Sequence, residues 1–274
     1  MKTRFIHLSE TDSTNRFLRD YHDDAEDDMV VVTTDFQTAG RGQGTHSWES
    51  ERAKNLLFSV LIHPVNVAVA DQFILSEVGA LALKNVLDTH TDGVTLKWPN
   101  DIYWRDQKIS GTLIETSVSS KGIRRCIFGV GVNVNQQVFR SDVTNPVSLR
   151  QIVGHEVDRE ALLHAIVSHL QDYLRRLYNG EQEPFRKAYH EALYHRQGFW
   201  PYIDDNGAFQ AEIITVTPDG HLHLRDDAGK ERLYAFGEVK CLIPVPSPRA
   251  PHPQPLHPER CSPPVAFPKG EGSR

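Results

Sequence analysis

Short strand-like runs alternate with amphipathic helical segments over residues 1–198, and this alternation limits the available folds more than any other feature. β-Branched and apolar runs indicate strands, whereas apolar residues repeating every three to four positions indicate helices. The predicted strands are Arg4–Leu8, Met29–Thr34, Leu56–Ile62, Val94–Lys97, Ile102–Trp104, Lys108–Thr116 and Arg125–Val134. The predicted helices run from Ser13 toward His22 and over Ala70–Thr89, Arg159–Tyr178 and Pro184–His195. This pattern predicts an α+β domain of mixed helices and strands.

After about Trp200 the pattern changes to short strands separated by tight turns. Strands are predicted at Ala208–Thr217, His221–Arg225, Glu231–Phe236 and Val239–Ile243, with glycine-containing turns between them. We therefore predict an α+β domain over 1–198 and a small barrel-like β domain over 199–246. Residues 247–274 are predicted to form a disordered tail, because ten of the chain's 16 prolines lie between Pro244 and Arg274.

Composition excludes several classes of protein. The net charge of -6 argues against a protein that coats DNA or RNA, since phosphate binding requires a basic surface. The sequence contains neither an apolar run long enough to span a bilayer nor a secretory signal, so we expect no membrane partner. Three widely spaced cysteines, Cys126, Cys241 and Cys261, fit a reducing compartment, and we expect a cytoplasmic protein.

A glycine-rich segment at residues 37–48 follows the second predicted strand. Its glycines allow backbone amides to approach an anion, and Arg41 adds a planar guanidinium that binds phosphate or carboxylate. Trp48 offers a flat face for a purine or an apolar ligand. The segment is no dinucleotide fingerprint, because Thr45 occupies the third glycine position, and it lacks the Gly-Lys-Ser/Thr of a P-loop. Glycine content alone favours a flexible loop, so both interpretations stay open.

Three further segments combine polar residues with predicted strand or helix ends. Lys97-Trp98-Pro99-Asn100-Asp101 places a cation for carboxylate or phosphate beside an acid that could orient it, hold a metal or accept a proton. The strand at 129–135 contains two glycines and Asn133, whose amide can read an adenine edge. Ser13-Thr14-Asn15 begins the first predicted helix. Taken singly, these segments are also explained by an Asx turn, an ordinary strand and a helix cap.

Motifs for metal binding and for serine hydrolases are missing from the sequence. The 14 histidines form no His-Glu-x-x-His pattern, and there is no Gly-x-Ser-x-Gly elbow. We therefore predict no metal site made by the chain's own residues.

Taken together and in order, these segments resemble the biotin protein ligases. The matching text is Thr11-Asp12-Ser13-Thr14-Asn15, Gln37-Thr38-Ala39-Gly40-Arg41-Gly42 with Trp48, Asn55-Leu56, Lys97-Trp98-Pro99-Asn100-Asp101, Lys108-Ile109-Ser110-Gly111 and Gly129-Val130-Gly131-Val132-Asn133. The resemblance covers roughly residues 3–243, and the Lys-Trp-Pro-Asn-Asp segment is its most specific part. It implies a mixed α/β catalytic domain followed by a small SH3-like barrel.

The resemblance implies a reaction in two steps. Biotin and ATP, assisted by Mg²⁺, form biotinyl-5′-adenylate and pyrophosphate, and a lysine of a biotin carboxyl carrier domain then attacks the adenylate. The implied catalytic residues are Lys97, Arg41 and Asp101. The implied biotin-binding residues are Ser13, Thr14, Asn15, Gln37, Gly40, Arg41, Gly42, Gln43, Lys97 and Gly111. The implied ATP-binding residues are Arg41, Trp48, Lys97 and Asn133.

The chain departs from the family pattern after Gly42. Gln43-Gly44-Thr45 stands where the family usually continues with Arg-Gly, so we expect weaker retention of the adenylate. The sequence begins at the first predicted catalytic strand, which resembles the monofunctional class without a DNA-binding domain. A lipoate ligase or octanoyl transferase, and a non-catalytic scaffold derived from a ligase, are the alternatives. The oligomeric state stays open, a homodimer included.

Overall fold

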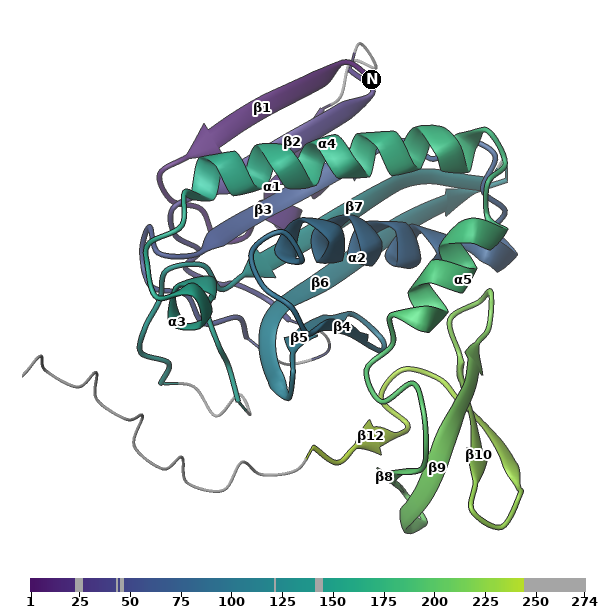
Figure 1. Ribbon diagram of the computed structural model, residues 1–274. Helices are drawn as coiled ribbons and strands as arrows, with labels where there is room; N and C mark the ends of the chain where they lie inside the picture. The colour runs from purple at the N-terminus through teal and green to yellow at the C-terminus, as the bar shows by residue number, and fades with distance from the viewer. Residues whose placement is uncertain (23–26, 43, 45–46, 121, 141–144, 244–274) are drawn as a thin grey trace, which may run out of the picture. The chain divides into compact units, whose positions relative to one another are not determined.

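The computed structural model describes residues 1–22, 27–42, 44, 47–120, 122–140 and 145–243, and it contains two sheets (Figure 1). The strands of the larger sheet are β1 (Thr3–Leu8), β2 (Met29–Thr34), β3 (Leu56–Ile62), β4 (Val94–Lys97), β5 (Asp101–Trp104), β6 (Gln107–Ser119) and β7 (Gly122–Val132). They lie in the order β1-β2-β3-β7-β6-β5-β4. The helices are α1 (Thr14–Asp20), α2 (Phe73–Leu87), α3 (Leu149–Val153), α4 (Arg159–Tyr178) and α5 (Glu183–Glu191). The predicted mixed α and β architecture is confirmed.

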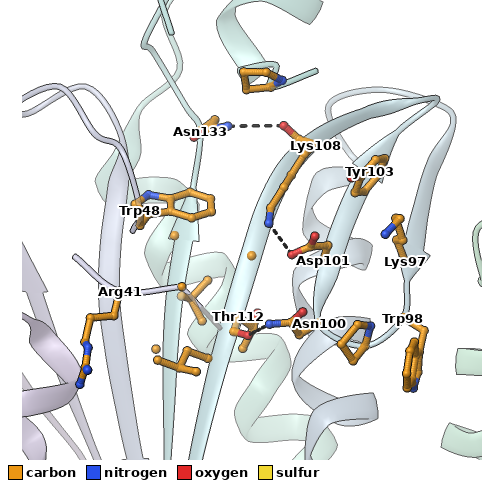
Figure 2. A pocket seen from close by; sticks show the side chains of 18 of the residues that line it. Arg41, Trp48, Lys97, Trp98, Asn100, Asp101, Tyr103, Lys108, Thr112 and Asn133 are labelled. Atoms are coloured by element: carbon orange, nitrogen blue, oxygen red, sulfur yellow. Dashed lines mark hydrogen bonds and ion pairs between the residues drawn. The ribbon is translucent and has the colours of Figure 1, made fainter. Parts of the chain in front are cut away.

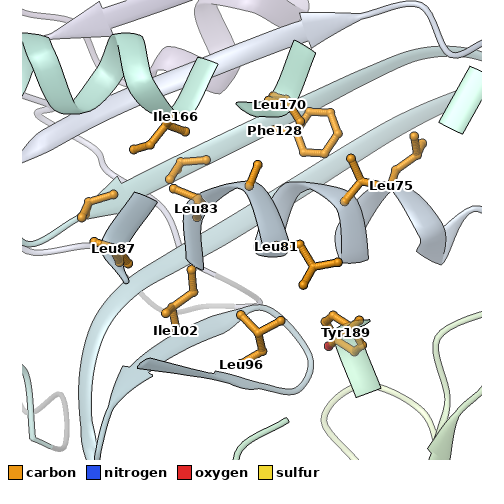
Figure 3. Close-up of a cluster of buried hydrophobic side chains, with 14 of the residues drawn as sticks. Leu75, Leu81, Leu83, Leu87, Leu96, Ile102, Phe128, Ile166, Leu170 and Tyr189 are labelled. Carbon is orange, nitrogen blue, oxygen red and sulfur yellow. The ribbon is translucent and has the colours of Figure 1, made fainter. Parts of the chain in front are cut away.

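Helices cover both faces of the larger sheet, which explains why β2 and β3 have apolar residues on both of their faces. In β2, Met29 and Val31 belong to the core under α2 and α4, whereas Val30 and Val32 join Leu18 of α1 on the opposite face. Successive side chains of a strand alternate between the two faces, so both sets are buried. Figure 3 shows the first core, where leucines of α2 and α4 meet Phe128 of the sheet.

The predicted bounds are confirmed for β2, β3, β4 and α4 and differ elsewhere. Helix α1 ends at Asp20 because Tyr21 has an extended backbone, so it does not reach His22. The turn between β5 and β6 is Arg105–Asp106, since Gln107 already begins β6. Helix α3 was not predicted, because five residues are too few to show a helical period.

One carboxyl group is buried among the leucines of α2. Glu77 is 2% exposed, and its Oε2 has no hydrogen-bond partner. Burial raises the pKa of Glu77 to about 7, and Arg186 offsets this only in part. An unfolded Glu ionises near 4.5. Between these two values the unfolded chain releases a proton that the folded chain retains, so stability falls as the pH rises from about 4.5 to 7.

We expect Glu77→Gln to stabilise the chain at high pH, because the amide cannot ionise on unfolding. Its advantage over the parent in the free energy of unfolding should increase by about 2 to 3 kcal/mol between pH 5 and pH 8. Urea unfolding of both proteins at the two pH values measures this. Glu160→Gln is the matched control, because the Glu160 side chain is exposed at the start of α4, and this variant should show no such increase. An advantage that does not change with pH would contradict the assignment.

The smaller sheet comprises β8 (Trp200–Asp204), β9 (Gly207–Val216), β10 (Leu222–Asp226), β11 (Glu231–Tyr234) and β12 (Lys240–Cys241). Its strands are antiparallel in the order β11-β10-β9-β8-β12, which confirms a small β structure after Trp200. Closure into a barrel and a domain boundary at 198 stay predictions, and the predicted tail at 247–274 lies outside the described residues. In the described part of the chain no helix is both long and apolar enough to cross a membrane.

Trp98 connects the smaller sheet to the larger one. Its indole Nε1 donates a hydrogen bond of 2.9 Å to the carbonyl oxygen of Gly220, and its ring lies edge-on to Phe236 at 5.3 Å between centroids. Phe73 of α2 contacts the same Phe236. The tryptophan between Lys97 and Pro99 therefore helps to hold the smaller sheet beside the larger one through Gly220 and Phe236.

Candidate active site

A pocket of about 980 Å³ gathers side chains from β4, β5, β6, β7, the start of α1 and the glycine-rich segment (Figure 2). The predicted site residues that line it are Ser13, Thr14, Asn15, Gln37, Arg41, Gly42, Trp48, Lys97, Asp101, Gly111 and Asn133. Gly40 is not among the lining residues, and Gln43 and Thr45 lie outside the described part of the chain. The predicted site residues, which lie up to 120 positions apart in the sequence, therefore line one cavity together with residues of the smaller sheet such as Tyr202 and Lys240.

A network of short polar side chains forms one part of the pocket wall. The Oε1 atom of Gln37 accepts a hydrogen bond from the backbone N–H of Thr14 at 2.8 Å and lies 3.1 Å from the Thr14 hydroxyl. Asn15 is buried behind Thr14, and Ser59 of β3 contacts both residues. Ser13 takes the cap position of α1, but its side chain makes no capping hydrogen bond, in contrast to the predicted cap. These side chains hold one another in place, so this part of the wall presents hydrogen-bond donors and acceptors in fixed positions to a small polar ligand.

Three glycines of β6 and β7 line the pocket, so no side chain of the sheet projects into it at these positions. Gly111 pairs with Gly131, and Gly129 lies two residues away along β7. A Cβ atom at Gly131 would overlap the indole of Trp48, and a Cβ at Gly129 would overlap the amide of Asn15. The glycines of this strand therefore leave room for two side chains of the pocket.

Cationic side chains lie in another part of the pocket. Lys97 ends β4 with its Nζ 5.5 Å from the ring centre of Tyr103, and no carboxylate of the described residues forms an ion pair with it. Lys108 forms an ion pair of 2.6 Å with Asp101 and lies 5.7 Å from the ring centre of Trp48. Figure 2 shows this lysine between Trp48 and Asp101. Arg41 is exposed at the edge of the pocket.

Tyr103 and Cys241 lie beside Lys97 and stay protonated. Burial raises the pKa of Tyr103, and the negative charge of Asp101 raises it further. Burial also raises the pKa of Cys241 to about 11, although Lys97 opposes this shift. His195, whose Nδ1 is 3.3 Å from the Cys241 sulfur, stays neutral because burial lowers its pKa to about 4. The site therefore has fixed positive charge but no activated thiolate, which suits binding and charge stabilisation better than covalent catalysis.

Sequence reasoning missed several residues of this pocket. Lys108 was quoted only as part of the Lys108-Ile109-Ser110-Gly111 segment and was given no role, although its alternation with Ser110 and Thr112 along a strand was an available signal. Asn100 was quoted only as part of a motif, yet its side chain donates to the Thr112 carbonyl at 2.6 Å and fastens the turn after Lys97. Ser59, which does not line the pocket but contacts Thr14 and Asn15 of its wall, gave a weaker signal, as the one hydroxyl within an apolar strand.

Comparison with known proteins identifies relatives of this fold and site. Residues 8–133 match the model of the biotin/lipoate A/B protein ligase family. A biotin–[acetyl-CoA-carboxylase] ligase of Paracoccus denitrificans is 30% identical over 233 residues, which cover 82% of this chain and 95% of the relative.

Two solved structures share the fold. The biotin protein ligase from Aquifex aeolicus in complex with biotin and ATP has a TM-score of 0.71 at 24% identity, covering 88% of this chain and 99% of the other. The biotin protein ligase from Leishmania major in complex with biotinyl-5-AMP has a TM-score of 0.58 at 23% identity, covering 85% and 98%. Because a relative at 30% identity aligns over nearly its whole length, the chain belongs to the biotin protein ligases of the biotin/lipoate ligase family.

Proposed function

We propose that the chain uses ATP to join biotin to a lysine of a biotin carboxyl carrier domain, through biotinyl-5′-adenylate. The observation that carries this proposal is that one pocket contains both the polar wall around Thr14 and Gln37 and the cation Lys97. Biotin has a polar cyclic urea at one end and a carboxylate at the other. The two ends require chemically different partners, and the pocket offers both.

Lys97 would act where the carboxylate meets the α-phosphate of ATP. Both groups are anionic, so their approach is unfavourable until positive charge offsets the repulsion. Lys97 and Arg41 supply fixed charge, and charge that is already in position stabilises a transition state without reorganisation. Asp101 keeps Lys108 directed into the pocket by the 2.6 Å ion pair, which makes this acid a positioning residue for a further cation.

Trp48 and Asn133 would bind the nucleotide base. The indole Nε1 of Trp48 is buried and has no hydrogen-bond partner within the described residues. Asn133 is 3% exposed, and its Nδ2 donates to the Lys108 carbonyl at 3.4 Å. An aromatic face beside a fixed amide suits a purine.

Mg²⁺ would arrive with ATP as the MgATP complex. The described residues contain no group of three His, Cys, Asp or Glu side chains that could hold a metal ion by themselves. Asp101 directs one oxygen to Lys108, so the phosphates would provide most of the ligands.

The acceptor would be a lysine of the carrier domain of a biotin-dependent carboxylase, in the cytoplasm. Its neutral amine would attack the adenylate carbonyl, form the amide and release AMP. Because the adenylate hydrolyses in water, the glycine-rich segment would serve to shield it.

Biotin-dependent exchange of labelled pyrophosphate into ATP tests the first step. We expect exchange with biotin and none with lipoate or octanoate. Exchange that requires lipoate or octanoate would move the chain to the alternative acyl ligases. No exchange with any acid would favour a non-catalytic scaffold.

A further inference from the structure

Ser59 is a buried hydroxyl in the middle of the apolar strand β3. It is 0% exposed, and the other six residues of Leu56–Ile62 are apolar. Its Oγ lies 2.7 Å from the Thr14 hydroxyl and 2.6 Å from the Asn15 Oδ1. It does not line the pocket, whereas Thr14 and Asn15 do. A buried polar group in such a strand costs stability unless its hydrogen bonds are satisfied, and both hydrogen-bond partners of Ser59 are residues of the pocket wall.

The amide of Asn15 can adopt only one orientation here. Its Nδ2 donates to the carbonyl of Leu113 at 3.3 Å and to a carboxylate oxygen of Glu115 at 3.2 Å. Arg19 holds that carboxylate with an ion pair of 2.7 Å. Rotating the amide by 180° would direct its oxygen at two acceptors. The Asn15 oxygen therefore faces Ser59, and since it can only accept, the Ser59 hydroxyl must donate to it.

The position of this hydrogen determines the next hydrogen bond. Ser59 has one hydroxyl hydrogen, and it points at Asn15. The 2.7 Å contact between the two hydroxyls therefore requires Thr14 to donate to Ser59. Gln37 also lies near the Thr14 hydroxyl, at 3.1 Å, but it is satisfied by the Thr14 backbone N–H at 2.8 Å. The shorter contact takes the hydrogen, because two oxygens at 2.7 Å with none between them would repel more strongly.

We propose that Ser59 is a positioning residue that fixes the direction in which the Thr14 hydroxyl presents its accepting lone pairs to the pocket. A ligand that presents an N–H to Thr14 is then favoured over one that presents a carbonyl or ether oxygen there. The proposal rests on the proposed function and deepens it, since the cyclic urea of biotin carries such N–H groups. Ser59 aligns the Thr14 lone pairs with such N–H groups without touching the ligand.

Replacing Ser59 with alanine tests the proposal. In this variant the Thr14 hydrogen turns to Gln37, so the lone pairs of Thr14 change direction. We expect the KM for biotin to rise about tenfold, with kcat and the KM for ATP within about twofold of the parent. Ser110→Ala is the matched control, because Ser110 is also 0% exposed but donates to a backbone carbonyl, that of Gly131. Its KM for biotin should stay within about twofold.

A double-mutant cycle separates positioning from a general structural effect. Thr14→Val removes the hydroxyl through which Ser59 acts, so adding Ser59→Ala to it should leave the KM for biotin unchanged. A further rise of about tenfold in that background would overturn the proposal, and so would equal effects of Ser59→Ala and Ser110→Ala. If the parent chain supported no exchange with biotin, the proposed function and this inference would both be wrong. Normal exchange by the parent with an unchanged KM in Ser59→Ala would contradict the inference alone.

Discussion

Replacing Lys97 with methionine is expected to slow adenylate formation by at least about a thousandfold. Lys97 lies at the end of β4, lines the pocket and forms no ion pair with a described carboxylate, so its charge is available to a substrate. Methionine has a similar length but no charge, so it removes the electrostatic contribution and preserves most of the packing. Both the carboxylate and the phosphate lose their shared cation. The loss should therefore fall on kcat more than on the KM for biotin.

Single-turnover pyrophosphate release measures this step directly. Lys187→Met on α5 is the control, because that ammonium is exposed and pairs only loosely with Glu191 at 3.9 Å. It should release pyrophosphate at the parent rate. Lys97→Arg should recover part of the activity, since it restores charge with a different shape. A Lys97→Met rate within about tenfold of the parent would remove Lys97 from the catalytic step.

Gly129→Ala should reduce kcat/KM for biotin by about a hundredfold. The new Cβ would overlap the side-chain amide of Asn15, and that amide cannot move freely because Ser59, Leu113 and Glu115 hold it. Helix α1 must then shift from the sheet and carry Thr14 with it. A displacement of about 1 Å at a binding group is enough for a loss of this size.

Steady-state kinetics on Gly129→Ala, beside unfolding curves, separates this loss from instability. Gly79→Ala is the control, because its Cβ would lie 3.1 Å from the ring of Phe128 in the core, away from the pocket. That variant should change the free energy of unfolding and leave the KM for biotin as it is. Normal kinetics in Gly129→Ala would mean that the start of α1 does not position biotin.

The sequence predicts the elements in which apolar residues follow a long helical period or an almost uninterrupted run. Helix α4 and strand β3 have the predicted bounds, because twenty residues of helical period and seven consecutive apolar-rich positions leave little choice. Short elements are different. The four-residue strand β4 was predicted, but the five-residue strand β8 and helix α3 were not. Their formation depends on pairing with β9 and on the Ser148–Gln151 capping box.

In the site, too, residues that belong to a local sequence motif were predicted, whereas residues whose role depends on distant partners were not. The sequence resemblance singles out Lys97, Arg41 and Thr14, which line the same pocket. Lys108 was quoted in a motif without a role, and Ser59 was not singled out, because the importance of both residues lies in partners far along the chain. A lysine in a strand becomes informative only when Trp48 lies beside it, and a serine in an apolar strand only when α1 packs above it.

Intact-mass spectrometry of a purified biotin carboxyl carrier domain, after incubation with this chain, biotin and MgATP, tests the central claim most directly. The account predicts one added biotin per carrier domain, no addition when ATP is omitted, and no addition when the acceptor lysine is replaced by arginine. A carrier that keeps its original mass with biotin but gains a lipoyl or octanoyl group would contradict it.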